Sequence, residues 1–249
     1  MNTVRILGVP IHAVTTAEAL AWIEAAVAAR APRQICTANP EFLMAAERDR
    51  EFFDLLNRAD LVLPDGIGLL WAARRLGGRL PERVAGSDLI YRIAERAAQN
   101  GWRLYLLGAG EGVAQKAAET LRARYPGLTI AGTFGGSPRV EDENEIVARV
   151  RAAQPDVLLV AYGAPEQDKW IARNRERVGA PVNIGVGGAF DFVAGAARRA
   201  PTWMQRAGIE WLHRLWRQPW RARRIFTAVV LFPLAVLRRG RGRSSRHFC

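Results

Sequence analysis

Several polar side chains in this sequence directly follow short apolar runs, at points where a β-strand would end. Asp65 stands between Pro64 and Gly66 after one such run, and Thr37 and Asn39 follow another. A carboxylate held at the end of a strand can act as a general base that removes a proton from a reacting hydroxyl group. The alternative role for Asp65 is a helix N-cap, a position at which Asp is also favoured.

Two further polar residues extend this group. Gln167 lies in YGAPEQD (162–168) after a third apolar run, and Asp191 follows the glycine-rich GVGG (185–188). Backbone amides in glycine-rich loops and at helix N-termini bind anionic groups such as phosphate. A set of purely structural loops would not need to gather these side chains, so we favour a functional site. Beside Gln167, Glu166 and Asp168 are interpreted as ordinary first-turn acids that the helix dipole stabilises.

Other candidate motifs are weaker. Arg83, taken alone, is most simply interpreted as the partner of Glu82 in a surface salt bridge. The three histidines and two cysteines show no metal-ligand spacing, so we expect neither a metal nor another cofactor. GAGEG (108–112) is similar to a dinucleotide-binding loop, but Val113 replaces the third glycine of that fingerprint. An NAD-dependent oxidoreductase is therefore the least favoured of three hypotheses for the function.

The elements that must hold these side chains alternate along the chain. Short β-rich segments recur, and a helical segment follows each of them. Nearly continuous apolar runs are typical of strands that helices cover on both faces. The alternation predicts an α/β fold with a Rossmann-like parallel sheet flanked by helices, whose ligands bind at the carboxyl ends of the strands. The predicted strands are 33–38, 60–65, 103–108, 128–133, 156–163 and 181–188; the predicted helices are 16–30, 40–58, 67–77, 87–100, 111–125, 141–153 and 165–178; and 4–11 forms a short hairpin or an edge strand.

The positive charge of the chain is concentrated near its C-terminal end. The 249 residues include 36 Lys and Arg against 24 Asp and Glu, and 49% are hydrophobic, which excludes a disordered chain. Residues 198–249 contain 13 Arg and one acid, Glu210, so 1–197 is neutral. We predict an α/β catalytic domain at 1–197 and a basic, Trp-rich helical appendage at 198–249. The two distant cysteines and the absence of a signal peptide favour a reducing cytosolic compartment.

The appendage has the composition of a membrane-surface element. Four of the eight Trp lie between 203 and 220, interleaved with Arg, and the apolar run 225–237 follows. This run is interrupted by Pro233 and is shorter than the roughly 20 residues that cross a bilayer, but it can lie in the interface. Trp and Arg suit the headgroups of an anionic membrane surface, so we expect peripheral attachment there. The alternatives are packing on the body or on a second subunit, which would give a homo-oligomer, and nucleic-acid binding, against which the apolar run argues.

Six segments together resemble the WecG/TagA/CpsF family of bacterial glycosyltransferases. They are TANPEFLMAAERD (37–49), LPDGIGLLWAARRLGG (63–78), ERVAGSDL (82–89), YGAPEQDKW (162–170), GVGGAFDFVAG (185–195) and RAPTWMQRAGIEWLHRLWRQPWRARR (199–224). They follow the order of the family over 33–224, most of the chain. Several separate motifs in order are far more specific than any single one. In the fourth motif the chain has Glu166, Gln167 and Asp168 where many relatives have a Lys-Gln-Glu run.

The resemblance implies the reaction and its location. Members of the family transfer a sugar, with inversion and without a metal, from a UDP-sugar to a sugar linked by diphosphate to a polyprenyl lipid. The donor sugar would be ManNAc, ManNAcA or a related hexose, in the synthesis of cell-surface polysaccharides. We therefore expect the chain at the cytoplasmic face of the bacterial plasma membrane.

The resemblance also implies roles for individual residues. Asp65 would be the catalytic base, and Thr37 and Asn39 would line the pocket for donor and acceptor. Arg83 and Gln167 would contact the substrates. The nucleotide would be held by Asp191 and by the glycine loop 185–188, which includes Gly185 and Gly187.

Arginines would stabilise the negative charge of a diphosphate, either that of the donor or that of the lipid-linked acceptor. From their spacing and the resemblance, we predict this role for Arg83 in the body and for Arg214, Arg221 and Arg224 in the appendage. The last three share one helical face unless Pro219 starts a new helix, and headgroup attraction is their alternative role. The alternative to an enzyme is a non-catalytic, membrane-tethered nucleotide-binding α/β module.

Overall fold

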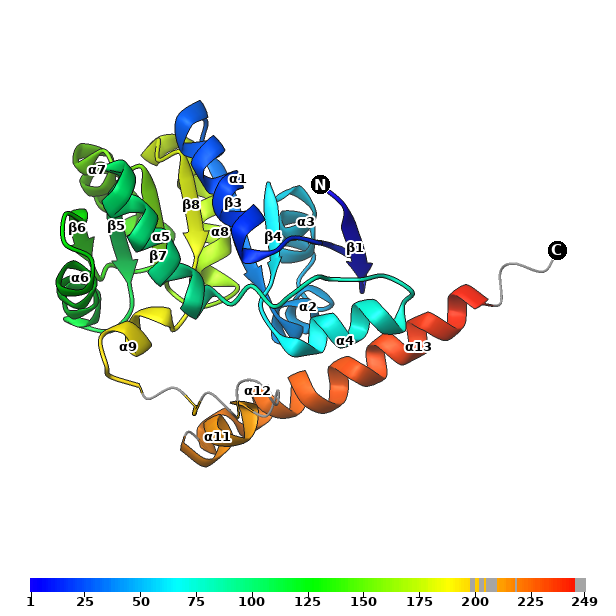
Figure 1. The fold of residues 1–249 in the computed structure, drawn as a ribbon. Helices are drawn as coiled ribbons and strands as arrows, with labels where there is room; N and C mark the ends of the chain where they lie inside the picture. Colours follow the sequence, from blue (N-terminus) through cyan, green and yellow to red (C-terminus); the bar gives the residue numbers. More distant parts are fainter. Residues whose placement is uncertain (198–199, 202–203, 205–209, 218, 245–249) are drawn as a thin grey trace.

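Six parallel strands form the central sheet of the protein (Figure 1). The computed structural model describes residues 1–197, 200–201, 204, 210–217 and 219–244. The strands are β3 (Arg33–Ala38), β4 (Leu61–Pro64), β5 (Arg103–Gly108), β6 (Thr129–Phe134), β7 (Val157–Ala161) and β8 (Val182–Gly185). They lie in the order β4-β3-β8-β7-β5-β6, and every adjacent pair is parallel. The predicted α/β fold with a Rossmann-like sheet is confirmed.

Helices cover both faces of the sheet. They are α1 (Thr16–Ala29), α2 (Pro40–Ala46), α3 (Arg50–Arg58), α4 (Ile67–Arg75), α5 (Gly86–Asn100), α6 (Val113–Arg124), α7 (Glu143–Ala153), α8 (Glu166–Val178) and α9 (Ala189–Val193). Side chains of a strand alternate between the two faces, so Leu106 of β5 belongs to the core cluster that includes α1, α5, α6 and α9, whereas Leu107 belongs to the cluster that includes α7 and α8. Because both faces are buried, the strands need the continuous apolar sequences that identify them.

Two N-terminal segments test the sequence prediction with different results. Of the two alternatives for 4–11, the hairpin is confirmed, because β1 (Thr3–Ile6) pairs antiparallel with β2 (Val9–His12) as a separate small sheet. The prediction of one helix over 40–58 is wrong. Asp49 accepts a hydrogen bond from the Phe52 N–H at 3.0 Å, and this cap begins α3 as a helix of its own after α2 has ended.

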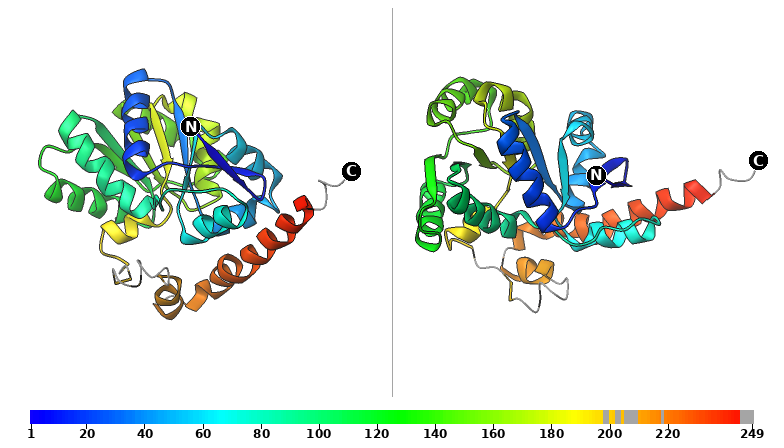
Figure 2. Two further views of the ribbon diagram at one scale, coloured as in Figure 1. Left: turned by 45° about the vertical axis from the view of Figure 1, so that its right-hand side comes forward. Right: turned by 45° about the horizontal axis from the view of Figure 1, so that its top comes forward.

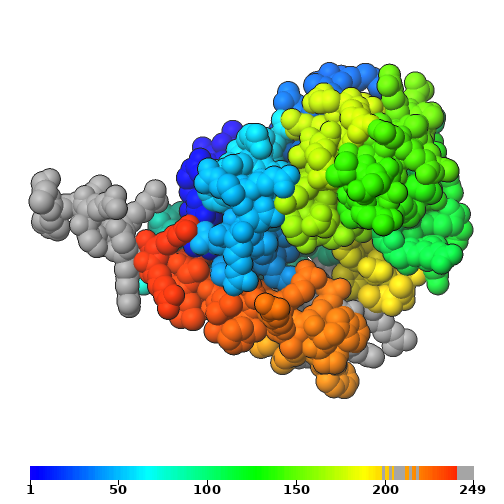
Figure 3. Space-filling model, turned by 180° about the vertical axis from the view of Figure 1, so that it is seen from behind, coloured from blue at the N-terminus to red at the C-terminus, as the bar shows by residue number. Residues whose placement is uncertain are grey.

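The C-terminal appendage lies along one side of the body (Figure 2). Its described elements are α11 (Glu210–Arg217), a 3₁₀ turn (Pro219–Arg221), α12 (Ala222–Phe226), a π-helical turn (Thr227–Leu231) and α13 (Phe232–Ser244). Seen from behind, it forms a continuous ridge along the edge of the body (Figure 3). Among the described residues, no helix combines the length and the apolar character that crossing a bilayer requires.

The apolar run 225–237 of the appendage has two kinds of surroundings. Phe232 and Val236 are fully buried in the cluster that also contains the inner side chains of α2 and α4. Phe226 and Leu234 remain exposed on the same run of helix. The run therefore packs on the body with one side and presents apolar side chains outward with the other.

Candidate active site

A pocket of about 490 Å³ opens at the carboxyl ends of four adjacent strands, β4, β3, β8 and β7. Its walls come from the loops that leave these strands, from the start of α5 and from the appendage. Parallel strands place all these loops at one edge of the sheet, as the sequence analysis expects. Nine of the residues singled out from the sequence line it: Thr37, Asn39, Asp65, Arg83, Gln167, Gly187, Asp191, Arg221 and Arg224.

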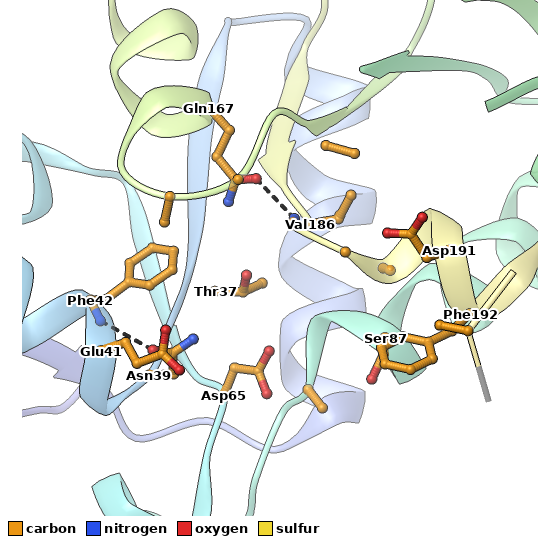
Figure 4. A pocket seen from close by; sticks show the side chains of 18 of the residues that line it. Thr37, Asn39, Glu41, Phe42, Asp65, Ser87, Gln167, Val186, Asp191 and Phe192 are labelled. Carbon is orange, nitrogen blue, oxygen red and sulfur yellow. Dashed lines mark hydrogen bonds between the residues drawn. The ribbon is translucent and has the colours of Figure 1, made fainter. Parts of the chain in front are cut away.

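Asp65 follows β4 directly, and its carboxylate points into the pocket (Figure 4). Its backbone N–H donates to the carbonyl of Ala38 at 2.7 Å, which extends the pairing of β3 and β4 by one residue. One carboxylate oxygen accepts a hydrogen bond from the N–H of Gly86 at 3.1 Å, in the first turn of α5. Gly66 occupies the N-cap of α4, which has no side-chain cap. The N-cap alternative for Asp65 is therefore wrong, and the carboxylate is held at the pocket.

Thr37 and Asn39 lie beside Asp65 at the end of β3 (Figure 4). The Thr37 hydroxyl donates to the carbonyl of Gly185 at 2.8 Å, which fixes Gly185 next to the pocket. Asn39 is the N-cap of α2: its Oδ1 accepts from the Phe42 N–H at 3.1 Å, and its amide nitrogen turns into the pocket. The three polar side chains thus meet in one corner, each held by a backbone group of a neighbouring segment.

Gly86 allows this corner to close. A Cβ on Gly86 would lie 3.3 Å from Thr37 Cγ2 and 3.6 Å from Asp65 Oδ2, so the first turn of α5 approaches β3 and β4 without a side chain between them. The same approach brings the Gly86 N–H to the Asp65 carboxylate. The glycine in the sequence AGSD is therefore explained by packing at the site.

Gln167 organises the glycine loop after β8. The side chain is 1% exposed, and its Oε1 accepts a hydrogen bond from the N–H of Gly187 at 2.8 Å. A Cβ on Gly185 would lie 2.6 Å from Gln167 Nε2, so only glycine lets the amide sit this close to β8. Asp191, from the following helix α9, lines the wall opposite Asn39 and Glu41 (Figure 4).

Asp168, the neighbour of Gln167, differs most from its prediction. We expected an ordinary first-turn acid stabilised by the helix dipole; Asp168 does lie in the first turn of α8, but its side chain is 0% exposed and packs against β3 and β8. A Cβ on Gly185 would lie 2.8 Å from Asp168 Oδ1, so this carboxyl group lies directly behind the glycine loop. Burial raises the pKa of Asp168 to about 7, although the Cys36 thiol and the Gln167 amide partly stabilise the ionised form.

Arg83 supplies a cation on the wall formed by the loop before α5. Its guanidinium Nη2 lies 3.8 Å from the Asp88 carboxylate, so the expected pairing with Glu82 is wrong. Glu82 instead accepts a hydrogen bond from the backbone N–H of Thr16 and holds α1 to this loop. Arg83 is therefore directed toward the pocket by an acid one turn into α5.

The appendage forms a further wall of the pocket, with Arg221 and Arg224. Arg224 Nη2 pairs with the carboxylate of Glu41 at 2.6 Å, which ties α12 to α2. The sequence predicted one helical face for Arg214, Arg221 and Arg224 unless Pro219 started a new helix. Pro219 begins the 3₁₀ turn between α11 and α12, so these arginines do not lie on one continuous helix. Arg214 lies in α11, and its side chain falls outside the part that the structure describes.

The pocket therefore joins a positioned carboxylate to cations on two of its walls. A carboxylate at hydrogen-bond reach of a hydroxyl can accept its proton, and guanidinium groups and backbone amides stabilise the negative charge of a diphosphate. Within the described residues, no three His, Cys, Asp or Glu side chains gather as a metal site. This arrangement suits group transfer from a phosphorylated donor to an alcohol.

Comparison with protein families decides the class of this chain. The model of the glycosyl transferase WecG/TagA/CpsF family matches residues 4–246. The chain belongs to this family. The predicted resemblance is confirmed, and the protein is a glycosyltransferase; neither the non-catalytic module nor the NAD-dependent oxidoreductase fits this membership.

Three relatives of this chain are named N-acetylglucosaminyldiphosphoundecaprenol N-acetyl-beta-D-mannosaminyltransferase. The protein of Bacillus subtilis (strain 168) is 37% identical over 204 residues, 82% of this chain and 78% of the relative. That of Bacillus spizizenii W23 is 34% identical over 214 residues, 86% of this chain and 82% of the relative. That of Staphylococcus aureus NCTC 8325 is 34% identical over 180 residues, 72% of this chain and 70% of the relative.

The pocket of this WecG/TagA/CpsF family member also contains residues that sequence reasoning missed. Glu41, Ser87, Tyr162 and Phe192 line it, and Glu41 pairs with the appendage. The sequence does not distinguish Glu41, an acid in the first turn of α2, from the other acids of the neutral body as the partner of an Arg-rich tail. No residue of the GAGEG loop after β5 lines the pocket within the described chain, so that loop does not contribute to this site.

Proposed function

We propose that the protein transfers a sugar from a UDP-sugar to a lipid-diphosphate-linked sugar, with inversion at the anomeric carbon. The donor sugar is ManNAc, ManNAcA or a related hexose, and the acceptor is linked to a polyprenyl diphosphate, as in the names of the relatives. The observation that carries this proposal is Asp65, held beside Thr37 and Asn39 in a pocket that also contains three arginines.

Asp65 acts as the general base in a single displacement. The acceptor hydroxyl loses its proton to the carboxylate as its oxygen attacks C1 of the donor, and the bond from C1 to the UDP oxygen breaks on the other side. One displacement of this kind inverts the configuration. It needs one carboxylate, whereas hydrolysis of a glycosidic bond uses two. Thr37 and Asn39 line the space between donor and acceptor.

The leaving diphosphate is stabilised by the wall opposite Asn39 and by arginines. In this proposal the glycine loop 185–188, whose Gly187 N–H is held by Gln167 Oε1, and Arg83 face the UDP group, and Asp191 accepts hydrogen bonds from the nucleotide hydroxyl groups. Arg221 and Arg224 face a diphosphate from the appendage side, with Arg214 assigned the same role from its sequence position. No step of this mechanism uses a metal or another cofactor.

The appendage also brings the pocket to its lipid substrate. Trp216 and Trp220 are 78% and 74% exposed, and Phe226 is exposed after them. Exposed aromatic side chains among arginines bind the interface of an anionic membrane. We propose peripheral attachment at the cytoplasmic face, with 1–197 as catalytic domain and 198–249 as membrane-binding appendage. A homo-oligomer formed through the same exposed side chains stays a prediction.

Acceptor mass is the measurement that tests this function. Purified full-length protein is incubated in EDTA with GlcNAc-diphosphate-undecaprenol and, separately, with each member of a panel of UDP-sugars. We expect a mass gain of one sugar with one donor and an inverted anomeric centre in the product. A gain that EDTA abolishes, or a protein that binds no UDP and transfers no sugar, would contradict the proposal.

A further inference from the structure

A second, smaller hollow continues from the active-site pocket between α2 and the appendage. Its volume is about 200 Å³, and its lining includes Met44 and Ala45 of α2, Ala164 of the loop after β7 and Thr227 of the π-helical turn. Apolar atoms make up more of its lining surface than polar atoms do, in contrast to the active-site pocket, and Arg48 adds a cation to its rim. We call this hollow the side groove.

The side groove and the active-site pocket share a boundary. Glu41, Phe42, Ala164 and Arg224 line both of them. The ion pair between Glu41 and Arg224, with a distance of 2.6 Å, therefore stands where the polar pocket passes into the apolar groove. Figure 4 shows Glu41 and Phe42 on the side of the pocket opposite Asp191, so the groove extends away from the wall that contains Asp191.

We propose that the side groove holds the first isoprene units of the polyprenyl chain of the acceptor. This inference rests on the proposed function, because it needs an acceptor whose sugar, diphosphate and chain follow one another. With the acceptor sugar at Asp65 and the diphosphate at Arg224, the chain must leave on the side of Glu41 and Phe42. An apolar groove at that boundary matches an apolar chain joined to a charged group.

The far wall of the groove leads toward the lipid. Thr227 is followed on the same helix by the exposed Val229, Val230 and Leu234. Ion pairs hold this helix on α2 at both ends of the contact, through Arg224 with Glu41 and Arg239 with Glu47. A chain in the groove therefore lies beside apolar side chains that lead from the pocket to an exposed apolar surface, which suits a substrate whose other end stays in the membrane.

The test compares two acceptors that carry the same GlcNAc-diphosphate group. One has the undecaprenyl chain and the other has a short alkyl chain, and both are assayed in detergent micelles so that membrane binding does not contribute. Ala45→Trp fills the groove. We expect its kcat/KM on the undecaprenyl acceptor to fall by about tenfold or more, with little change on the short-chain acceptor and an unchanged Kd for the UDP-sugar.

Two further variants guard against a folding artefact. Met44→Gln keeps the volume of the side chain but makes it polar, and we expect a higher KM for the undecaprenyl acceptor without a change in kcat. Ala25→Trp places the same bulk on an exposed position of α1, on the opposite face of the sheet, and should behave like the wild type. The thermal unfolding temperature of each variant is measured alongside.

Four outcomes would overturn the proposal. If Ala45→Trp keeps the wild-type kcat/KM on the undecaprenyl acceptor, or lowers activity on both acceptors equally, the chain does not use the groove. If it loses only binding to lipid vesicles, the groove holds membrane acyl chains instead. A wild-type protein that transfers sugar to neither acceptor would refute the proposed function itself, which separates that failure from failure of the groove.

Discussion

The strand-end wall of the pocket and the appendage wall hold their functional side chains in different ways. Thr37, Asp65 and Gln167 each hydrogen-bond to a backbone group of another loop, within a buried sheet. Arg224 is instead held by an ion pair with Glu41 in which its side chain is 58% exposed. Backbone hydrogen bonds at a buried edge fix positions, whereas exposed ion pairs contribute little to stability and give way easily. In the proposed function, the chemistry therefore belongs to the rigid wall and substrate capture to the adaptable one.

The largest effect should come from the rigid wall. Asp65→Asn removes the base while keeping the size of the side chain, and we expect kcat to fall by about 10²- to 10⁴-fold. Initial rates with the undecaprenyl acceptor measure this, and UDP-sugar binding should persist. Activity within a few-fold of the wild type would show that another group takes the proton and that the rigid wall does not carry the chemistry.

A pH titration tests how deeply the rigid wall is buried. The pKa of Asp168 is raised from 3.8 to about 7 in the folded state, so between these values the folded protein keeps a proton that the unfolded chain has lost. The free energy of unfolding should therefore fall as pH rises through this window, by about 1.4 kcal/mol per pH unit. Urea unfolding at pH 5, 6 and 7 measures this slope.

The matching variant for that titration is Asp168→Asn, which has no carboxyl group to ionise. Its free energy of unfolding should lack this component, so that it gains on the wild type as pH rises. Parallel curves for the wild type and Asp168→Asn would mean that the surroundings of the Asp168 carboxyl group are hydrated.

On the appendage wall, two ion pairs of similar exposure allow a matched comparison. Arg224 pairs with Glu41 at the pocket, and Arg239 pairs with Glu47 outside it, with side chains 58% and 55% exposed. We expect Arg224→Ala to lower kcat/KM for the acceptor by about 10²-fold through loss of a diphosphate contact, while Arg239→Ala has little effect. Equal losses would mean that both arginines only hold the appendage in place.

The smallest effect should concern membrane binding alone. The double variant Trp216→Ala, Trp220→Ala removes the two most exposed aromatic side chains of the described appendage, so binding to anionic vesicles should weaken several-fold while transfer in detergent is unchanged. Val140→Ala, at an exposed apolar position on the body, is the control. Vesicle sedimentation measures binding, and an unchanged double variant would place the lipid contact elsewhere.

The sequence predicted the rigid wall better than the appendage wall. Strand ends could be located because strands buried on both faces need continuous apolar runs, and parallel strands bring their exits to one edge. That placed Asp65, Thr37 and Asn39 together. Asp168 was missed because an acid in the first turn of a helix is usually solvated, and only packing of α8 on the sheet shows otherwise. Its position three residues before the buried Ile171 was the available signal.

The appendage was less predictable because composition does not say which side of a helix is covered. The apolar run suggested either lipid or protein as its surroundings, and the structure gives protein to Phe232 and leaves Phe226 exposed. The π-helical turn between them breaks the regular period from which a covered face is normally inferred. The acids that pair with the appendage arginines, such as Glu41 and Glu47, lie nearly 200 residues away from them in the sequence. Only the folded structure identifies these pairs.

The docking of α13 on the body fixes the number of residues that can separate Phe232 from Arg224. Phe232 is buried near Gly68, so the position of Arg224 depends on the length of the helix between these two residues. One residue gained or lost between them would rotate Arg224 by roughly a quarter of a turn around the helix axis and carry it out of the pocket. Natural variation in length should therefore be excluded from 225–232.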